Sequence, residues 1–175
     1  MALTFLIGGA RSGKSTMALR LASAFAGPVA VIATAEARDD DMAGRIAEHR
    51  AARPSTWTTI EEPLELAGAV DAVGEGTFVL LDCLTLWVSN ALEAGRPDGE
   101  LVAEAAALSS TLAARRTPSV VVSNEVGLGI VPANALARTY RDLLGRVNAA
   151  VAAVADRSFL VVAGRGVALD APDLP

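Results

Sequence analysis

Short apolar runs alternate along the chain with longer segments in which apolar residues recur three or four positions apart. Because these runs are apolar almost throughout, rather than at alternate positions, they are typical of strands buried on both faces. They are bounded by Gly, Pro, Asp or Ser and lie at Leu3–Ile7, Val29–Ala33, Phe78–Leu81, Val120–Val122 and Phe159–Val162, with Trp57–Ile60 as a further candidate edge strand.

The segments between the runs have helical spacing and predict helices over residues 14–26, 40–52, 63–73, 84–94, 100–115 and 134–154. Alternating strands and helices indicate an α/β fold of three layers, in which a mainly parallel sheet lies between layers of helices. Ligands in such folds bind beyond the carboxyl ends of the strands. We therefore expect functional side chains directly after a strand, or at the start of the helix that follows it.

Length and composition narrow the class of protein. A chain of 175 residues is typical of one domain, which we assign to residues 1–169, with residues 170–175 as a C-terminal tail. No apolar run approaches the roughly 18 residues of a membrane span, and no secretion leader precedes the first strand. The net charge of −5 provides no general attraction for nucleic acid. The single cysteine, Cys83, cannot form an internal disulfide, which is compatible with a reducing cytoplasm.

The loop after the first apolar run carries the clearest chemical signal. Residues Gly8-Gly9-Ala10-Arg11-Ser12-Gly13-Lys14-Ser15 match the pattern Gly-x-x-x-x-Gly-Lys-Ser/Thr, and Lys14 is the only lysine in the chain. Glycines let the backbone turn tightly and aim successive N–H groups at an anion, to which the following helix presents its positive end. We expect Lys14 to reach the β- and γ-phosphates of a nucleotide and the Ser15 hydroxyl to bind Mg²⁺.

Asp82 directly follows the apolar run Phe78–Leu81. Many phosphate-loop proteins place a carboxylate at the end of such a strand, close to Mg²⁺. Asp82 is therefore a candidate metal-binding residue, either directly or through a water molecule. The alternative is a structural role as the N-cap of the helix that contains Leu84 and Trp87.

The only histidine, His49, lies on a helix that three aspartates are expected to begin. Arg45, His49 and Arg53 are four positions apart, so they project along one line of that helix. Two flanking guanidiniums disfavour an imidazolium, and we expect the ring to be uncharged at neutral pH. Such a ring is a nucleophile that can attack a triphosphate held by the arginines and form a phosphoramidate. From spacing alone, the alternative is a solvated histidine on a charged helix face with no chemical role.

Two pairs of polar residues near other strand ends each have two interpretations. Asn124 and Glu125 follow a predicted strand and precede a loop with several glycines. They either orient an acceptor hydroxyl or a water of Mg²⁺, or stabilise the loop through side-chain hydrogen bonds. Glu61 and Glu62 precede Pro63 and either cap a helix there or accept hydrogen bonds from the N1–H and amino groups of guanine.

Two further sets of residues are assigned structural roles. Arg138, Asp142 and Arg146 are four positions apart on the last predicted helix, which predicts a ladder of ion pairs. The two tryptophans, Trp57 and Trp87, are assigned to packing in the core or at an interface.

Motifs spread over nearly the whole chain match the sequence pattern of a single protein family. The matching segments are Gly8–Ser15, Ala33–Ala35, Met42–Pro54, Trp57 with Glu61, Asp82–Thr85, Asn124–Gly127, Ile130–Pro132, Arg141-Asp142, Gly145, Asn148 and Val161–Gly164. Together they closely resemble the bifunctional adenosylcobinamide kinase/adenosylcobinamide-phosphate guanylyltransferase family of cobalamin biosynthesis. Two departures from frequent family patterns, Asn148-Ala149 and Gly164-Arg165-Gly166, concern acceptor or interface contacts rather than the nucleotide chemistry.

The resemblance implies a two-step activity. The enzyme would phosphorylate the aminopropanol hydroxyl of adenosylcobinamide with a nucleoside triphosphate, ATP or GTP, and then transfer GMP from GTP to the new phosphate through a guanylylated histidine. His49 is the only histidine available for that step. The resemblance also implies a RecA-like phosphate-loop fold with a parallel sheet, and assembly as a homotrimer.

The motifs and the resemblance together define the candidate site. Lys14 and His49 are the candidate catalytic residues, Ser15 and Asp82 the candidate Mg²⁺ ligands, and Asn124 and Glu125 a candidate acceptor site. The predicted nucleotide-binding residues are Gly8, Gly9, Ala10, Arg11, Ser12, Gly13, Lys14, Ser15, Ala33, Thr34, Ala35, Arg45, Arg50, Arg53, Glu61 and Asp82.

Two other functions compete with this interpretation. The first is a phosphate-loop small-molecule kinase in which Lys14, Ser15 and Asp82 transfer a γ-phosphate and His49 takes no part. The second is a nucleotide-gated switch protein. Switch GTPases usually read guanine through an Asn-Lys-x-Asp element, which this chain cannot contain because its only lysine is in the phosphate loop.

Overall fold

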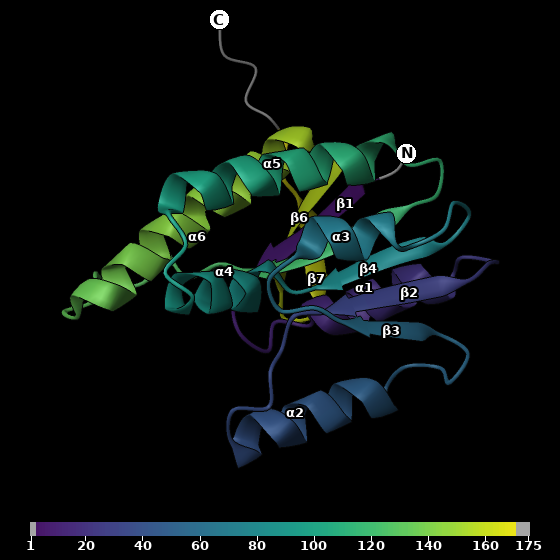
Figure 1. The fold of residues 1–175 in the computed structure, drawn as a ribbon, viewed down its shortest axis with the longest axis horizontal. Coiled ribbons are helices and arrows are strands. Elements are labelled where there is room, and N and C mark those ends of the chain that lie inside the picture. The colour runs from purple at the N-terminus through teal and green to yellow at the C-terminus, as the bar shows by residue number, and fades with distance from the viewer. Residues whose placement is uncertain (1–2, 171–175) are drawn as a thin grey trace, which may run out of the picture.

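The computed structural model describes residues 3–170 as one seven-stranded sheet with helices on both faces (Figure 1). The strands are β1 (Leu3–Gly8), β2 (Val29–Ala33), β3 (Thr58–Glu61), β4 (Phe78–Asp82), β5 (Ser119–Asn124), β6 (Arg157–Val162) and β7 (Arg165–Ala168). The helices are α1 (Lys14–Ser23), α2 (Asp40–Ala51), α3 (Leu66–Asp71), α4 (Leu84–Glu93), α5 (Asp98–Ala114) and α6 (Ala135–Val154).

The sheet has the strand order β3-β2-β4-β5-β1-β6-β7. All neighbouring strands are parallel except β6 and β7, which are antiparallel. The predicted mainly parallel α/β sheet is thus confirmed, including the edge strand expected near Trp57–Ile60. Parallel pairing brings the carboxyl ends of β1 to β5 to one edge of the sheet.

Each face of the sheet has its own hydrophobic core. Successive residues of β1 alternate between them, with Phe5 in the larger core and Leu6 in the smaller one. The larger core lies under α3, α4, α5 and α6, and the smaller one under α1. Trp87 is fully buried in the larger core, whereas Trp57 is half-buried against the smaller one. Both tryptophans therefore pack as expected.

Helix α2 belongs to neither core. It contains no buried residue, and in Figure 1 it lies apart from the rest of the molecule, beyond the edge strand β3. Its beginning follows the sequence prediction, because the Asp39 carboxylate caps it by accepting from the Met42 N–H at 2.7 Å. A helix without a buried face must be held in place by polar contacts and by its connecting segments.

The last strand was not predicted from the sequence. Val162 pairs with Arg165 across a two-residue turn, in which Ala163 and Gly164 have φ angles of 51° and 75°. Positive φ at both positions is the geometry of a type I′ hairpin turn. The Gly164 N–H donates to the Ser12 carbonyl at 2.7 Å, so the hairpin contacts the phosphate loop.

Some local predictions were wrong. The predicted ladder on α6 does not form, because Arg138 donates to backbone carbonyls of the preceding loop. Asp142 instead accepts from Arg141, and Arg146 bonds to Asp98 at the start of α5, at 2.8 Å. The helix predicted over residues 63–73 covers only Leu66–Asp71.

The tail predicted for residues 170–175 lies, apart from Asp170, outside the described residues. Within residues 3–170, no helix is both long and apolar enough to cross a bilayer.

Candidate active site

The carboxyl ends of five parallel strands form the floor of a cleft of about 510 Å³. Most residues predicted for the nucleotide site line it, so the sequence motifs converge in space. The lining comprises Ala10, Arg11, Ser12, Gly13, Lys14, Ser15, Thr16, Ala33, Ala35, Met42, Arg45, Ile46, Glu48, His49, Arg50, Arg53, Glu61, Asp82, Cys83, Thr85, Leu86, Val122 and Asn124. Gly8, Gly9, Thr34 and Glu125 are the predicted site residues outside this set.

Close packing against the β6–β7 hairpin fixes the phosphate loop. Gly13, which immediately precedes α1, has φ 101°, and a Cβ atom there would lie 2.8 Å from the Cα of Gly164. At Gly8 a Cβ would lie 2.3 Å from the carbonyl oxygen of Val161. Any larger residue would displace backbone at both positions. The two invariant glycine positions of the motif are therefore required by the hairpin as well as by the turn itself.

Lys14 begins α1 with its ammonium directed back over the loop. Nζ donates to the carbonyl oxygens of Gly8 at 2.8 Å and Gly9 at 2.7 Å. The residue is 6% exposed, and this burial lowers the pKa of the amine, opposed by the nearby Cys83 and Asp82. The charge is thus already held above the loop that is expected to cradle phosphate.

His49 reaches across the cleft from α2 to the end of β4. Its Nδ1 lies 3.3 Å from Oδ2 of Asp82. The hydrogen bond to Asp82 raises the pKa of His49 above its ordinary value, while burial and the Arg53 charge lower it. The sequence prediction of a ring disfavoured as imidazolium was therefore wrong. It counted the arginines on the same helix and missed the carboxylate on another element.

Asp82 is not the cap of α4. The N-cap position is Cys83, which makes no side-chain capping bond. The Asp82 side chain is only 14% exposed and turns toward His49 and the cleft. The placement favours the chemical interpretation of Asp82 over the structural one.

Two arginines of α2, Arg45 and Arg50, and Arg53 just beyond its end line the cleft with His49. Arg45 pairs with Asp41 at 3.0 Å within the helix, and Arg53 donates to Thr59 at 3.4 Å. Arg50 forms an ion pair with Glu61 at the end of β3. The three guanidiniums bring positive charge to this side of the cleft, where guanidiniums can bind phosphate oxygens, and the carboxylates of Asp41 and Glu61 balance two of them.

The residues at the end of β2 either line the cleft or support its wall from behind. Ala33 and Ala35 line the cleft, but Thr34 is fully buried. The Thr34 hydroxyl donates to the Cys83 carbonyl at 2.7 Å and accepts from the Cys83 N–H at 2.9 Å.

Desolvation, followed by the Asp82 charge, raises the pKa of the Cys83 thiol to about 11. Cys83 is therefore protonated at neutral pH and does not compete with His49 as a nucleophile.

At the other side of the cleft, Asn124 and Glu125 have different surroundings. Asn124 lines the cleft, and its N–H donates to the Thr85 hydroxyl at 2.7 Å. The Glu125 carboxylate accepts from the Gly127 N–H and so folds over its own loop. Glu62 accepts from the Leu64 N–H at 2.9 Å and the Glu65 N–H at 2.8 Å. It therefore holds the turn that precedes α3 and does not cap the helix itself, whose N-cap Glu65 has no side-chain capping bond.

The donor set near the phosphate loop fits Mg²⁺. Ser15 and Asp82 offer a hydroxyl and a carboxylate oxygen on the same cleft. Among residues 3–170, no group of three or more His, Cys, Asp or Glu side chains could hold a metal. Mg²⁺ usually binds through one or two protein oxygens together with substrate phosphates and water, so a cage of protein ligands is not needed here.

Several lining residues had no functional signal in the sequence. Thr85 on α4 accepts from the Asn124 N–H. In the sequence it stood out only as the last residue of the matching segment Asp82–Thr85. The others are Thr16, Met42, Ile46, Glu48, Cys83, Leu86 and Val122. Met42 and Ile46 lie four positions apart on α2, but a pattern of apolar residues does not distinguish a cleft wall from a core.

Comparisons with known proteins show the family to which the chain is related. A model of the family described as cobinamide kinase / cobinamide phosphate guanyltransferase matches residues 4–169. The chain is 46% identical over 160 residues to the bifunctional adenosylcobalamin biosynthesis protein CobP of Pseudomonas aeruginosa, covering 91% of this chain and 92% of that protein. It is 41% identical over 181 residues to the bifunctional adenosylcobalamin biosynthesis protein CobU of Escherichia coli K12, covering 94% and 98%. The corresponding Salmonella typhimurium protein is 43% identical over 178 residues, with the same coverage of 94% and 98%.

Proposed function

We propose that this chain, which belongs to the cobinamide kinase / cobinamide phosphate guanyltransferase family, carries out both of the family's reactions in the cleft between the phosphate loop and α2. It is a bifunctional enzyme of adenosylcobalamin biosynthesis. In the first reaction, the hydroxyl of adenosylcobinamide bonds to the γ-phosphorus of ATP or GTP, and the nucleoside diphosphate leaves. In the second, the new phosphate receives GMP from GTP, and pyrophosphate is released.

The phosphate loop holds the triphosphate in both reactions. Its backbone N–H groups and the start of α1 bind phosphate oxygens, and Lys14 exchanges the carbonyls of Gly8 and Gly9 for the β- and γ-phosphates. Ser15 and Asp82 would hold Mg²⁺, which when bound would supply positive charge to the phosphates. Asn124 lies on the acceptor side, with Glu125 in the adjoining loop, where a hydroxyl or phosphate of the corrinoid can be oriented.

His49 is the nucleophile of the second reaction. With Nδ1 directed at Asp82, the proton resides on Nδ1 and the Nε2 lone pair is available. Nε2 bonds to the α-phosphorus of GTP as the bond to pyrophosphate breaks, and Arg45 and Arg53 stabilise the triphosphate charge. An oxygen of the cobinamide phosphate then bonds to the same phosphorus, the P–N bond breaks, and the imidazole is restored.

The base and the assembly complete the proposal. The Glu61 carboxylate accepts from the N1–H and amino groups of guanine. Because this carboxylate is paired with Arg50, the arginine must release it or share it when guanine binds. Ala33 and Ala35 border the same part of the cleft, and the buried Thr34 fixes their backbone. We extend the proposal to a homotrimer, which the family resemblance implies and light scattering would measure.

The observation that carries the proposal is the convergence of His49, Asp82 and Lys14 on one cleft. Wild-type protein is incubated with Mg²⁺ and GTP labelled at the α-phosphate, and its intact mass is measured for an added GMP. His49→Gln is the matched variant, because its amide can still face Asp82 but offers no nucleophilic ring nitrogen. We expect an acid-labile label on wild type and none on the variant. No label on wild type, with cobinamide phosphorylation intact, would instead support a kinase without nucleotidyl transfer.

A further inference from the structure

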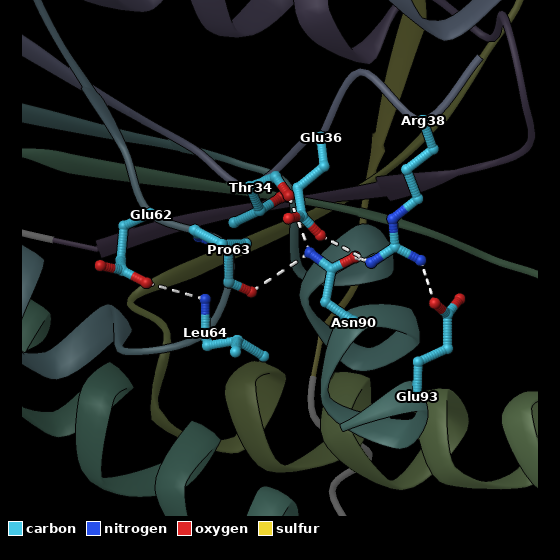
Figure 2. A network of polar contacts seen from close by, with 8 residues as sticks. All are labelled: Thr34, Glu36, Arg38, Glu62, Pro63, Leu64, Asn90 and Glu93. Atoms are coloured by element: carbon cyan, nitrogen blue, oxygen red, sulfur yellow. Dashed lines mark hydrogen bonds and ion pairs between the residues drawn. The ribbon is translucent and has the colours of Figure 1, made fainter. Parts of the chain in front are cut away.

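Asn90 on α4 joins three segments around the cleft without lining it. The residue is 6% exposed. Its Nδ2 donates to the carbonyl oxygens of Thr34 at 2.9 Å and Pro63 at 3.2 Å, and its Oδ1 accepts from the Arg38 guanidinium at 3.0 Å. Figure 2 shows the amide at the centre of these contacts. Both donors of a single side chain are used on backbone carbonyls of two different loops.

The amide holds both ends of the segment that leads from β2 to α2. At one end, Thr34 is additionally fixed by its two hydrogen bonds with Cys83. At the other end, Arg38 bonds to Glu36 at 2.6 Å and to Glu93 on α4 (Figure 2). Arg38 immediately precedes the residue that caps α2. Helix α4 therefore fixes the place where α2 begins.

The contact with Pro63 fixes the second attachment of α2. Pro63 follows the end of β3, where Glu61 pairs with Arg50 near the C-terminal end of α2. The Trp87 indole on α4 supports the same loop by donating to the Leu64 carbonyl at 2.9 Å. Because α2 has no buried residue, these polar attachments set its orientation, and a helix transmits that orientation along its length to His49.

We propose that Asn90 is a positioning residue for guanylyl transfer, which orients α2 and the loop after β3 so that His49 and Glu61 face the nucleotide. The inference rests on the proposed role of His49. Asn90 does not line the cleft, and its hydrogen bonds go to Arg38, Thr34 and Pro63, outside the phosphate loop. Its removal therefore affects the covalent step more than phosphoryl transfer, whose main components lie on β1 and α1.

The test uses Asn90→Asp, in which a carboxylate of the same shape cannot donate to the two carbonyls. The rates of GMP adduct formation and of cobinamide phosphorylation are measured with the full chain, together with trypsin cleavage after Arg45 and Arg50. We expect adduct formation to slow by about tenfold or more, because small misplacement of a nucleophile is costly. Phosphorylation should change by less than about threefold, and trypsin should cleave α2 faster than in wild type.

Asn148→Asp is the matched control. Asn148 is a buried amide on α6, 5% exposed, that accepts from Ser123 at 2.6 Å and donates to the Asn124 carbonyl at 3.0 Å. Its substitution removes a similar buried donor and should leave trypsin cleavage of α2 at the wild-type rate. Should Asn90→Asp not fold, Arg38→Met decides, because this exposed side chain holds the same segment and its loss should act in the same direction with smaller size.

Equal losses of both activities in Asn90→Asp, with α2 cleaved as in wild type, would overturn the inference and leave Asn90 a structural residue. A failure of the proposed function would look different. Wild-type protein would then form no GMP adduct, while the trypsin comparison would still report whether Asn90 holds α2.

Discussion

The two walls of the cleft are built in opposite ways. The phosphate loop connects β1 to α1, and its lysine and flanking strand are buried, with Leu6 fully enclosed in the smaller core. Helix α2 forms the facing wall without burying a single residue, and it is held by His49–Asp82, Arg50–Glu61 and the Asn90 contacts. One wall is part of the fold, whereas the other is attached to it.

This difference separates stability from chemistry. Apolar burial is the main source of folding free energy, while exposed ion pairs contribute about 0–1 kcal/mol each. Residues of the phosphate-loop wall therefore serve the fold and both reactions. Residues of α2 can be exchanged with little loss of stability, and their substitution tests one reaction at a time.

The largest effect is expected from Lys14→Ala. Without the ammonium, neither the γ-phosphoryl transfer nor the attack on the α-phosphorus has its charge neutralised, and both rates should fall by at least roughly a hundredfold. Steady-state phosphorylation and adduct formation measure this, with Lys14→Arg as a control for charge without the compact ammonium. Near-wild-type kinase turnover in Lys14→Ala would show that the phosphate loop does not serve both steps.

His49→Ala should abolish one activity only. GMP adduct formation should fall below detection, while cobinamide phosphorylation continues near the wild-type rate, because the phosphate loop is unchanged. Intact mass and a phosphorylation assay on the same preparation distinguish the two. If both activities disappeared in a folded variant, the imidazole would serve triphosphate binding rather than covalent transfer.

Truncation of one apolar side chain in each wall should cost different amounts of stability. Leu6→Ala removes a fully buried side chain of β1 and should lower the free energy of unfolding by about 2–5 kcal/mol. Ile46→Ala removes a half-buried side chain of α2 and should cost about 1 kcal/mol or less. Urea unfolding measures both. Equal costs would mean that α2 is packed in solution more tightly than in this structure.

The smallest effects concern the pKa of His49. As the only histidine, it gives one NMR titration, which should lie above 6.5 because of its bond to Asp82. Asp82→Asn should lower this pKa and Arg53→Gln should raise it. A pKa unaffected by Asp82→Asn would contradict the contact.

The sign of the pH dependence follows from that raised pKa. The His49–Asp82 attraction is fully present below pH 6.5 and is lost as pH rises through the folded-state pKa. Its contribution to stability is small, because His49 is half-exposed. Adduct formation, which needs the uncharged ring, should increase over the same pH range.

Much of this arrangement could be predicted from the chain alone. Continuous apolar runs indicated the parallel strands, and parallel pairing then placed Asp82, Glu61 and Asn124 at the same edge as the phosphate loop. Local patterns sufficed there because each residue's position follows from the end of its own strand.

Contacts between distant elements could not be predicted in this way. The pKa of His49, on α2, depends on Asp82 at the end of β4. Arg146 pairs with Asp98 on α5 and not with a residue of its own helix. Asn90 looked like an ordinary polar position in a helix, although its amide holds two loops. Spacing reports which residues share a face, but not what the fold places opposite that face.

The contact between Gly164 and Ser12 also bears on the order in which the enzyme is made. The phosphate loop leaves the ribosome before the hairpin that braces it, because β6 and β7 follow every other strand and helix that the structure describes. A nascent or prematurely terminated chain thus carries the lysine motif without its support. The braced form of the phosphate loop is therefore available only after β6 and β7 have been synthesised.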